Sequence, residues 1–279
     1  MLKRRKKRGQ SGPLTYILLV FIVVAINMPV FQMVMVGLKR RDEAMISTRF
    51  FPERPQFVNF VNILRDTNFG LYLTNSVMVA VLTTICCICI ALFAGYAISR
   101  FRGKIFSGYL IALLLLQIFP IMLLLIPLFV IFSGLGLVDN LGALVLAYTT
   151  LNVPFSIWMI KGFMDTIPFD LEEAAMIDGA SQFQALLRVI FPITLPGVTA
   201  VGIFTFINSW SEYTLASILV RSTENLTITV GLQEFAQQFY TDWASKMTAA
   251  TIGTIPMLIF LIFAQKYLIR GMSAGSVKG

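Results

Sequence analysis

The sequence predicts an all-α, polytopic membrane protein with six transmembrane helices and a polar, helical cytoplasmic loop. Of its 279 residues, 57% are hydrophobic and 13% are charged, and the mean hydropathy is +0.80. These values lie outside the usual range of soluble domains. Six long apolar runs account for them, at 9–38, 67–99, 105–138, 140–160, 189–220 and 247–265.

Each apolar run has the length of one membrane crossing. A helix needs about 20 apolar residues to span a bilayer, so every run is long enough for one helix and too short for two. Only the run at 189–220 contains a charged residue, Glu212. Prolines inside the runs are expected to kink helices without ending them, because neighbouring helices satisfy the freed backbone groups. Five of these prolines are Pro120, Pro127, Pro154, Pro196 and Pro256.

The distribution of Lys and Arg predicts that both termini are cytoplasmic. The formal net charge is +8, and the basic cluster KRRKKR comes just before the first run. With the N-terminus inside, cytoplasmic segments hold 14 of the 22 Lys and Arg residues, as the positive-inside tendency requires. The first run is too long for the apolar part of a signal peptide. We therefore expect a basic N-terminus at 1–13, a six-helix domain at 14–270 with a cytoplasmic loop at 168–192, and a cytoplasmic tail at 271–279.

The residue types needed for several kinds of chemistry are missing. The chain contains no His, which removes the Ser/His and Cys/His nucleophile arrangements. Its three cysteines, Cys86, Cys87 and Cys89, fall within the second run, where membrane packing explains them better than a metal site. No phosphate-binding Gly-x4-Gly-Lys motif is present. We expect no catalytic residue, metal or cofactor in this chain.

The loop at 168–192 is unusually polar for this sequence and predicts a helix, a Gly turn and a second helix. Asp170 is placed to cap the first helix, with Glu173 three residues later. Gly179 is placed to end that helix in the left-handed conformation. Ser181 and Gln184 form a second capping box, which starts a helix that we expect to end near Ile190, before Pro192.

A helix-turn-helix of this kind could also bind DNA, but its charge argues against that function. Residues 161–188 hold two basic and five acidic side chains, which would repel phosphate. We therefore expect no nucleic-acid partner. A compact acidic loop suits docking to another protein, and the small residues Ala174, Ala175 and Gly179 would let that protein approach closely.

The stretch EEAAMIDGASQFQALLRVIFP resembles the EAA motif of permease subunits of bacterial ATP-binding-cassette importers. The motif reads E-A-A-x3-G-x9-I-x-L-P, with Val189 here in place of Ile and Phe191 in place of Leu. The whole chain is similar to the shorter permease of maltose-type carbohydrate importers, including WSEYTLA in the fifth run and the tail GMSAGSVKG. That family usually has Asn where this chain has Ser211.

The resemblance implies a division of labour among several proteins. An extracytoplasmic solute-binding protein would deliver a carbohydrate, of oligosaccharide size, to this chain and a second homologous permease, which together form the path across the lipid membrane. Two copies of a cytoplasmic ABC ATPase, holding ATP and Mg, would drive the switch through the loop. This chain would itself be non-catalytic. The residues implied in ATPase coupling are Glu172, Glu173, Ala174, Ala175, Asp178, Gly179 and Pro192.

The fifth predicted helix carries candidate residues for the translocation path. Thr205, Asn208 and Glu212 follow a spacing that puts them on one side of a helix. Glu212 would lie about 12 Å below the outer end of its span, and an ionisable group at that depth is often functional. Three roles stay open: contact with solute hydroxyls, support of the outer gate, or a structural hydrogen bond to a neighbouring helix.

Two other functions compete with an importer subunit. An ion-coupled secondary transporter would have inverted repeats and more ionisable groups within the membrane. A polytopic scaffold or sensor would assemble with an ATPase without moving solute. Neither the solute nor the direction of transport follows from the sequence of spans.

Overall fold

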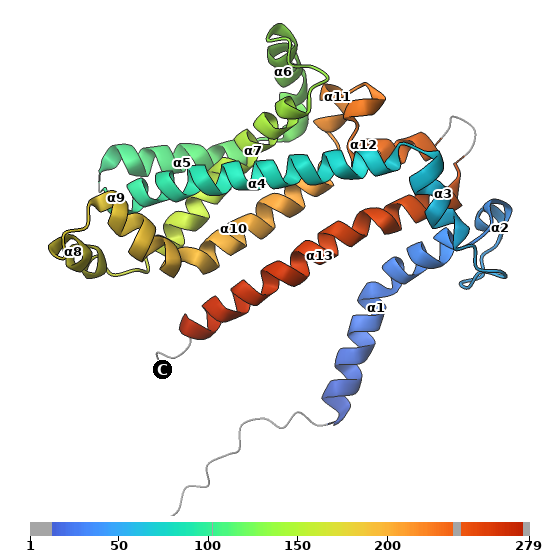
Figure 1. Cartoon of the computed structure of the whole chain (residues 1–279), viewed down its shortest axis with the longest axis horizontal. Coiled ribbons are helices and arrows are strands. Elements are labelled where there is room, and N and C mark those ends of the chain that lie inside the picture. Colours follow the sequence, from blue (N-terminus) through green and yellow to red (C-terminus); the bar gives the residue numbers. More distant parts are fainter. Residues whose placement is uncertain (1–12, 102, 237–240, 276–279) are drawn as a thin grey trace, which may run out of the picture. The chain divides into compact units, whose positions relative to one another are not determined.

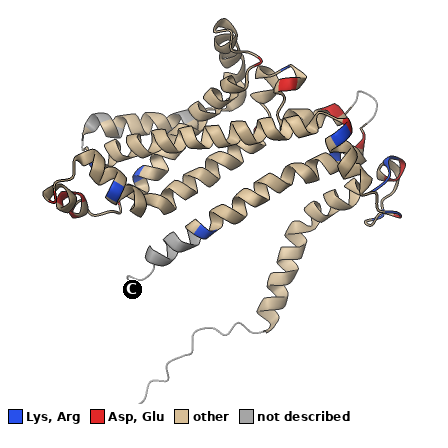
Figure 2. Ribbon diagram, in the orientation of Figure 1, with Lys and Arg blue, Asp and Glu red and all other residues tan. Residues whose placement is uncertain are grey.

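The computed structural model describes residues 13–101, 103–236 and 241–275, and these ranges are helical with no β-strand. The chain divides into two compact units, described separately here. The larger unit holds residues 64–234 and the chain from residue 253 onward, and the smaller holds the chain up to residue 63 together with residues 235–252. Figure 2 shows charged residues gathered near helix ends and in connecting segments, with long uncharged stretches between them.

Three long helices form the core of the larger unit: α4 (Phe69–Arg100), α7 (Leu141–Met164) and α10 (Phe191–Ser211). α4 packs along α7, and α10 packs against both (Figure 1). Small residues allow this close approach. A Cβ atom on Gly95 would lie 2.8 Å from Ile160, and one on Gly197 would lie 2.5 Å from Phe163. A larger residue at either glycine would therefore push α7 away from its neighbour.

Shorter helices connect these core helices or follow α10. They are α5 (Lys104–Ile118), α6 (Ile121–Gly134), α8 (Asp170–Ile177), α9 (Gln182–Ala185), the π-helical turn η1 (Leu186–Ile190), α11 (Ala216–Leu219), η2 (Thr223–Asn225), α12 (Ile228–Gly231) and η3 (Leu232–Phe235). The last helix, α13 (Trp243–Gly275), begins in the smaller unit and continues in the larger. There its Phe260 stacks on Phe206 of α10, with 3.9 Å between ring centroids.

The smaller unit contains α1 (Pro13–Gly37), α2 (Arg41–Ile46), most of α3 (Val58–Asp66) and the first turns of α13. The Gly37 carbonyl at the end of α1 accepts hydrogen bonds from Asn59 Nδ2 at 2.8 Å and Thr248 Oγ1 at 2.9 Å. The buried Lys39 donates to the carbonyls of Ser47 and Arg49. These contacts join the end of α1 to the following segment and to α13.

Among the residues that the structure describes, five helical stretches are long and apolar enough to cross a membrane: Pro13–Gly37, Phe69–Arg100, Leu141–Met164, Gln182–Ser211 and Trp243–Tyr267. This confirms the prediction of a polytopic all-α membrane protein. The third predicted span differs, because it consists of the two shorter helices α5 and α6. The prediction of a kink at Pro120 was wrong, since α5 ends at Ile118 and α6 begins after Pro120.

A proline disfavours the helical conformation of the residue before it, and Pro120 itself is extended, with ψ at 121°. The helix therefore ends before Pro120, and α6 leaves the direction of α5 (Figure 1). The other four prolines lie inside α6, α7, α10 and α13, as the sequence predicts.

Hydrogen bonds around Asp139 join two segments of the larger unit near the start of α7. The carboxylate of Asp139 accepts hydrogen bonds from the backbone N–H groups of Arg221 and Ser222, at 2.9 and 3.0 Å, and from the Ser222 hydroxyl. These backbone donors, of which Arg221 has the larger effect, lower the pKa of Asp139 to about 2. Asn225 donates to the Asp139 carbonyl. The turn before α7 is thus tied to the segment after α11.

Candidate functional site

The polar loop folds largely as its local sequence predicts. After α8, Gly179 takes φ at +89°, the left-handed conformation that glycine adopts at little cost. The Ser181 hydroxyl accepts from Gln184 N–H at 3.3 Å, and the Gln184 side chain accepts from Ser181 N–H at 2.9 Å. This capping box is confirmed, and it fixes the start of α9.

The predicted cap at Asp170 is wrong. α8 has Phe169 at its N-cap with no side-chain hydrogen bond, and Asp170 is already the first helical residue. Phe169 itself has helical angles, with φ −66° and ψ −30°, so the extended backbone that an N-cap side chain needs does not occur here. Asp170, Glu172 and Glu173 still occupy the first turn, where negative charge is favourable to the helix dipole.

The helix that begins after Ser181 also continues beyond the predicted end. α9, η1 and α10 form one apolar helical stretch, Gln182–Ser211, and Pro192 lies in the first turn of α10. The backbone N–H of Phe191 bonds to the Leu186 carbonyl, five residues earlier. Proline has no backbone N–H and would normally interrupt the hydrogen bonds of a helix. The π turn before Pro192 accommodates this interruption, so the helix continues. The loop is therefore continuous with the long helix α10.

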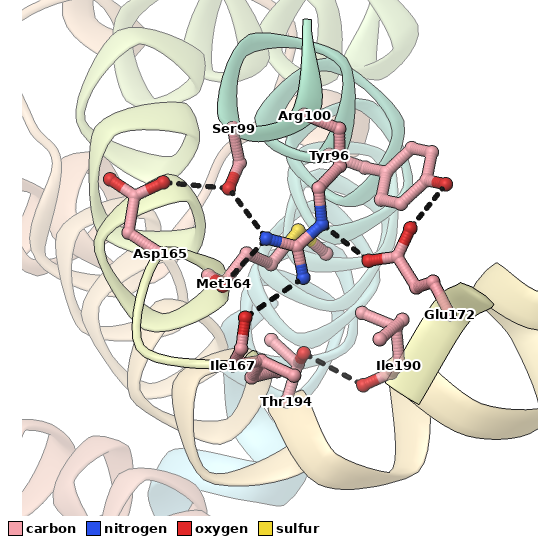
Figure 3. A network of polar contacts seen from close by, with 9 residues as sticks. All are labelled: Tyr96, Ser99, Arg100, Met164, Asp165, Ile167, Glu172, Ile190 and Thr194. Atoms are coloured by element: carbon pink, nitrogen blue, oxygen red, sulfur yellow. Dashed lines mark hydrogen bonds and ion pairs between the residues drawn. The ribbon is translucent and has the colours of Figure 1, made fainter. Parts of the chain in front are cut away.

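A buried ion pair holds α8 against the end of α4 (Figure 3). The Glu172 carboxylate pairs with Arg100, and these side chains are 2% and 6% exposed. Glu172 also accepts a hydrogen bond from the Tyr96 hydroxyl at 2.9 Å. The Arg100 guanidinium donates to the carbonyls of Met164 and Ile167, each at 3.3 Å. A buried charge is tolerated only when it is paired and hydrogen-bonded in this way.

Further polar contacts extend this network to the end of α7. The Ser99 hydroxyl donates to Asp165 at 2.6 Å, and Lys161 also pairs with Asp165. The Arg100 guanidinium lies 5.6 Å from the centre of the Phe169 ring, a favourable distance for a cation–π contact. The ends of α4 and α7 and the start of α8 are thus fastened to one another.

The face of the loop that points to solvent is acidic and apolar. Asp170, Glu173 and Asp178 are exposed there, beside Ile177, which is 85% exposed, and Phe183, which is 59% exposed. Exposed apolar side chains gathered among charges are typical of an interaction surface. A cavity of about 1090 Å³ lies beside it, lined by residues that include Arg100, Asp170 and Glu173.

The structure separates the residues implied in coupling into two groups. Glu173, Ala174, Asp178, Gly179 and Pro192 are exposed. Ala175 is half-buried, and Glu172 is buried on the opposite side, against α4. Its partners Arg100 and Tyr96 were not identified from the sequence, because they lie 72 and 76 residues away. The only sequence signal for Arg100 is its place at the end of an apolar run.

The three candidate path residues lie at the other end of α7 and α10. Asn208 donates from Nδ2 to the side-chain oxygen of Asn152 at 3.2 Å. Thr205 is fully buried, with its hydroxyl 3.5 Å from that of Ser156. Asn208 and Glu212 line a common cavity of about 500 Å³, whose lining does not include Thr205. Of the three predicted residues, Asn208 and Glu212 therefore line the cavity, and Thr205 is buried in the core.

The sequence predicts that Glu212 lies within the fifth membrane helix, and this prediction is wrong. Glu212 ends α10, with ψ at 124°, and its carboxylate accepts from the backbone N–H groups of Leu215 at 2.8 Å and Ala216 at 3.1 Å. Its carbonyl accepts from the Thr229 hydroxyl at 2.7 Å. The side chain folds back onto the following turn, which satisfies the donors at the start of α11. These hydrogen bonds are made to its own turn, so the three roles left open for Glu212 stay predictions.

Comparisons with known proteins agree with this architecture. The sequence is 34% identical over 268 residues to the sulfoquinovosyl glycerol transport system permease protein SmoH of Agrobacterium fabrum, covering 96% of this chain and 94% of the relative. It is 30% identical to the diacetylchitobiose uptake system permease protein DasC of Streptomyces coelicolor, covering 93% and 95%. It is 33% identical to the trehalose/maltose transport system permease protein MalG of Thermococcus litoralis, covering 85% and 87%.

The fold also matches a solved transporter. A chain of a bacterial ABC transporter involved in the import of the acidic polysaccharide alginate superimposes with a TM-score of 0.78, at 21% identity, covering 94% of this chain and 99% of that one. Residues 87–274 match the family described as binding-protein-dependent transport system inner membrane component. The chain therefore belongs to this family of multi-pass permease subunits of ABC transporters.

Proposed function

We propose that this chain is the permease subunit of an ATP-driven importer for a carbohydrate and that its loop at 168–192 transmits the closure of ATPase subunits. The named relatives transport sulfoquinovosyl glycerol, diacetylchitobiose, and trehalose or maltose, which supports a glycosidic solute. The chain has no catalytic role and no cofactor of its own. ATP and Mg bind to its partners.

The observation that carries this proposal is the arrangement of α8. Its outer face combines exposed acidic and apolar side chains, while its inner face is fixed to α4 by Glu172 and Arg100. A force applied to such a helix is passed on to the bundle, because packed interfaces switch between discrete arrangements and do not deform continuously. Glu173 and Asp178 are then contacts for the ATPase, and Glu172 is a positioning residue.

The complete transporter contains this chain, a second homologous permease, two copies of a cytoplasmic ABC ATPase and an extracytoplasmic solute-binding protein. A solved ABC transporter with the same fold was crystallised with an alginate-bound periplasmic protein. Both termini and the α8 loop of this chain face the cytoplasm. Asn208 and Glu212 line this chain's half of the translocation path, with Thr205 supporting the helix behind them.

Co-purification from native membranes in mild detergent tests the proposal. We expect the intact chain to retain a second permease and an ATPase. Glu173→Lys and Gly179→Asp should reduce the retained ATPase at least about tenfold, because they reverse a charge and distort the turn at the docking face. The second permease should be retained by both variants.

Glu224→Lys is the matched control, since Glu224 is an exposed acid in η2, far along the chain from the loop. We expect it to leave the ATPase bound. Recovery of the intact chain without any ATPase would refute the proposal. Normal ATPase retention in both loop variants would refute the role of the loop alone.

A further inference from the structure

The cavity lined by Asn208 and Glu212 has the size and the polar lining of a small-molecule binding site. It is lined by residues from the end of α5, the start of α6, the first half of α7 and the second half of α10. The end of α10 lies remote from α8 (Figure 1). Its volume of about 500 Å³ falls within the range of small-molecule sites. One or two sugar rings fit such a space.

Two buried hydroxyl groups in its wall make no hydrogen bond of normal geometry. They belong to Tyr148, 1% exposed, and Ser209, 7% exposed. The Tyr148 hydroxyl makes only a weak hydrogen bond to the Glu212 carboxylate, whereas the Ser209 hydroxyl has no partner. In the described part of the chain, Thr83 also has a buried hydroxyl without a partner, but it does not line this cavity. A buried polar group without a partner is costly, and a bound ligand would remove that cost.

The rest of the lining indicates the chemistry of the ligand. Side-chain amides of Gln117, Asn152 and Asn208 offer donors and acceptors. Tyr213, 44% exposed, presents an aromatic ring suited to packing against the apolar face of a sugar. None of the described lining residues is Lys or Arg. The one ionisable acid, Glu212, already accepts two backbone N–H groups and would repel an anion.

We propose that this cavity is a solute-binding subsite in this chain itself and that it takes a neutral, polyhydroxylated ring in preference to an anionic one. The Tyr148 and Ser209 hydroxyls bind hydroxyl groups of the ring, the amides fix its orientation, and Tyr213 covers one face. The inference rests on the proposed carbohydrate import, and it narrows the class of solute.

Saturation-transfer difference NMR on the assembled permease–ATPase complex in nanodiscs, without the solute-binding protein, tests the subsite directly. The probes are maltose, trehalose, cellobiose and cellobiouronic acid, the last two of which differ by one carboxylate. We expect binding of at least one neutral disaccharide and none of cellobiouronic acid. Tyr148→Phe and Ser209→Ala should each raise the apparent Kd about threefold to tenfold, the loss of one hydrogen bond.

Thr83→Val is the matched control, because Thr83 has a buried hydroxyl without a partner outside the cavity. We expect it to leave binding unchanged. If the Tyr148 hydroxyl had only a structural role, Tyr148→Phe would leave the apparent Kd for the sugar unchanged. The free energy of unfolding would stay the same or rise, since the change removes a buried polar group that lacks a good hydrogen bond.

Unchanged binding in both cavity variants, or equal binding of cellobiose and cellobiouronic acid, would overturn the subsite. So would the absence of neutral-sugar binding in a complex that takes up one of these sugars once its binding protein is added. In all three cases the proposed import function would stand. A complete transporter that hydrolyses ATP but takes up no carbohydrate would refute the proposed function and the subsite together.

Discussion

At the residue scale, the pair between Arg100 and Glu172 controls how firmly α8 is held. Both side chains are nearly inaccessible, so removing one leaves the charge of the other buried and unpaired. We expect Glu172→Leu and Arg100→Met each to lower the free energy of unfolding of the full chain by about 3–5 kcal/mol. The double variant should lose much less than the sum of the two. Denaturation in mixed micelles, followed by circular dichroism, measures these differences.

Lys161→Met provides a control for the loss of an ion pair as such. Lys161 and Asp165 are 25% and 42% exposed, and an ion pair this accessible contributes about 0–1 kcal/mol. If Glu172→Leu cost no more than Lys161→Met, the buried pair would not be what holds α8. In the complete transporter, the double variant should also move less solute per ATP hydrolysed, although its stability is restored.

Sequence reasoning found the residues whose partners are close in the chain. The box formed by Ser181 and Gln184 and the left-handed Gly179 follow from local spacing, and both occur as predicted. Arg100 and Tyr148 were missed, because nothing local distinguishes a basic or aromatic residue that finds its role through another helix. Glu212 was placed inside a helix because hydropathy alone would continue that helix, whereas its carboxylate binds the N–H groups of the next turn at the end of α10.

At the element scale, the turn between α8 and α9 depends on one backbone conformation. A Cβ atom on Gly179 would meet no neighbour within 4 Å, so a change to Ala acts only through its φ of +89°. We expect Gly179→Ala to destabilise the full chain by about 1–2 kcal/mol. Gly162→Ala should stabilise it by about 0.5–1 kcal/mol, because Gly162 lies inside α7 with equally open space.

The two alanine variants should thus shift the melting temperature in opposite directions, as measured by differential scanning fluorimetry in detergent. A shift in the same direction would show that the turn tolerates other conformations. Gly179→Ala should also weaken ATPase retention, since α8 could then reorient against α9, whereas Gly162→Ala should not.

The membrane helices could be predicted from apolar run length, but where they break could not. Run length gave no reason to divide the third span, and the proline rule for membrane helices favoured a kink at Pro120. The break follows instead from the extended conformation of Pro120. At Pro192 the opposite occurred, because the π turn at Leu186–Ile190 lets one helix run from the loop into the bundle. Both outcomes depend on packing that hydropathy does not encode.

At the scale of the whole molecule, α1 is a membrane helix without a polar face. It is apolar along its length and long enough to cross a membrane. A helix that is hydrophobic all round requires lipid or another apolar surface. The second homologous permease and the membrane supply that surface in the proposed transporter.

If Glu172 and Arg100 fasten α8 to α4, the two helices move as one body when ATP binds to the complete transporter. Spin labels can be attached at Ile177→Cys, on the exposed face of α8, and at Ile90→Cys, in α4. Double electron–electron resonance then measures the distance between the two labels. Ile177 is 85% exposed and Ile90 is 43% exposed, so both can carry a label. We expect one narrow distance distribution, the same without nucleotide and with ATP and vanadate.

The experiment needs a background in which Cys86, Cys87 and Cys89 are Ser, with transport first shown to persist. Adding Glu172→Leu to that background should broaden the distribution, because α8 then loses its charged anchor while Gly179 and the capping box keep its helical fold. A nucleotide-dependent shift in the otherwise intact chain would mean that α8 pivots on α4 during the cycle. The force would then pass through the continuous helix Gln182–Ser211, and the ion pair would serve only to stabilise the resting state.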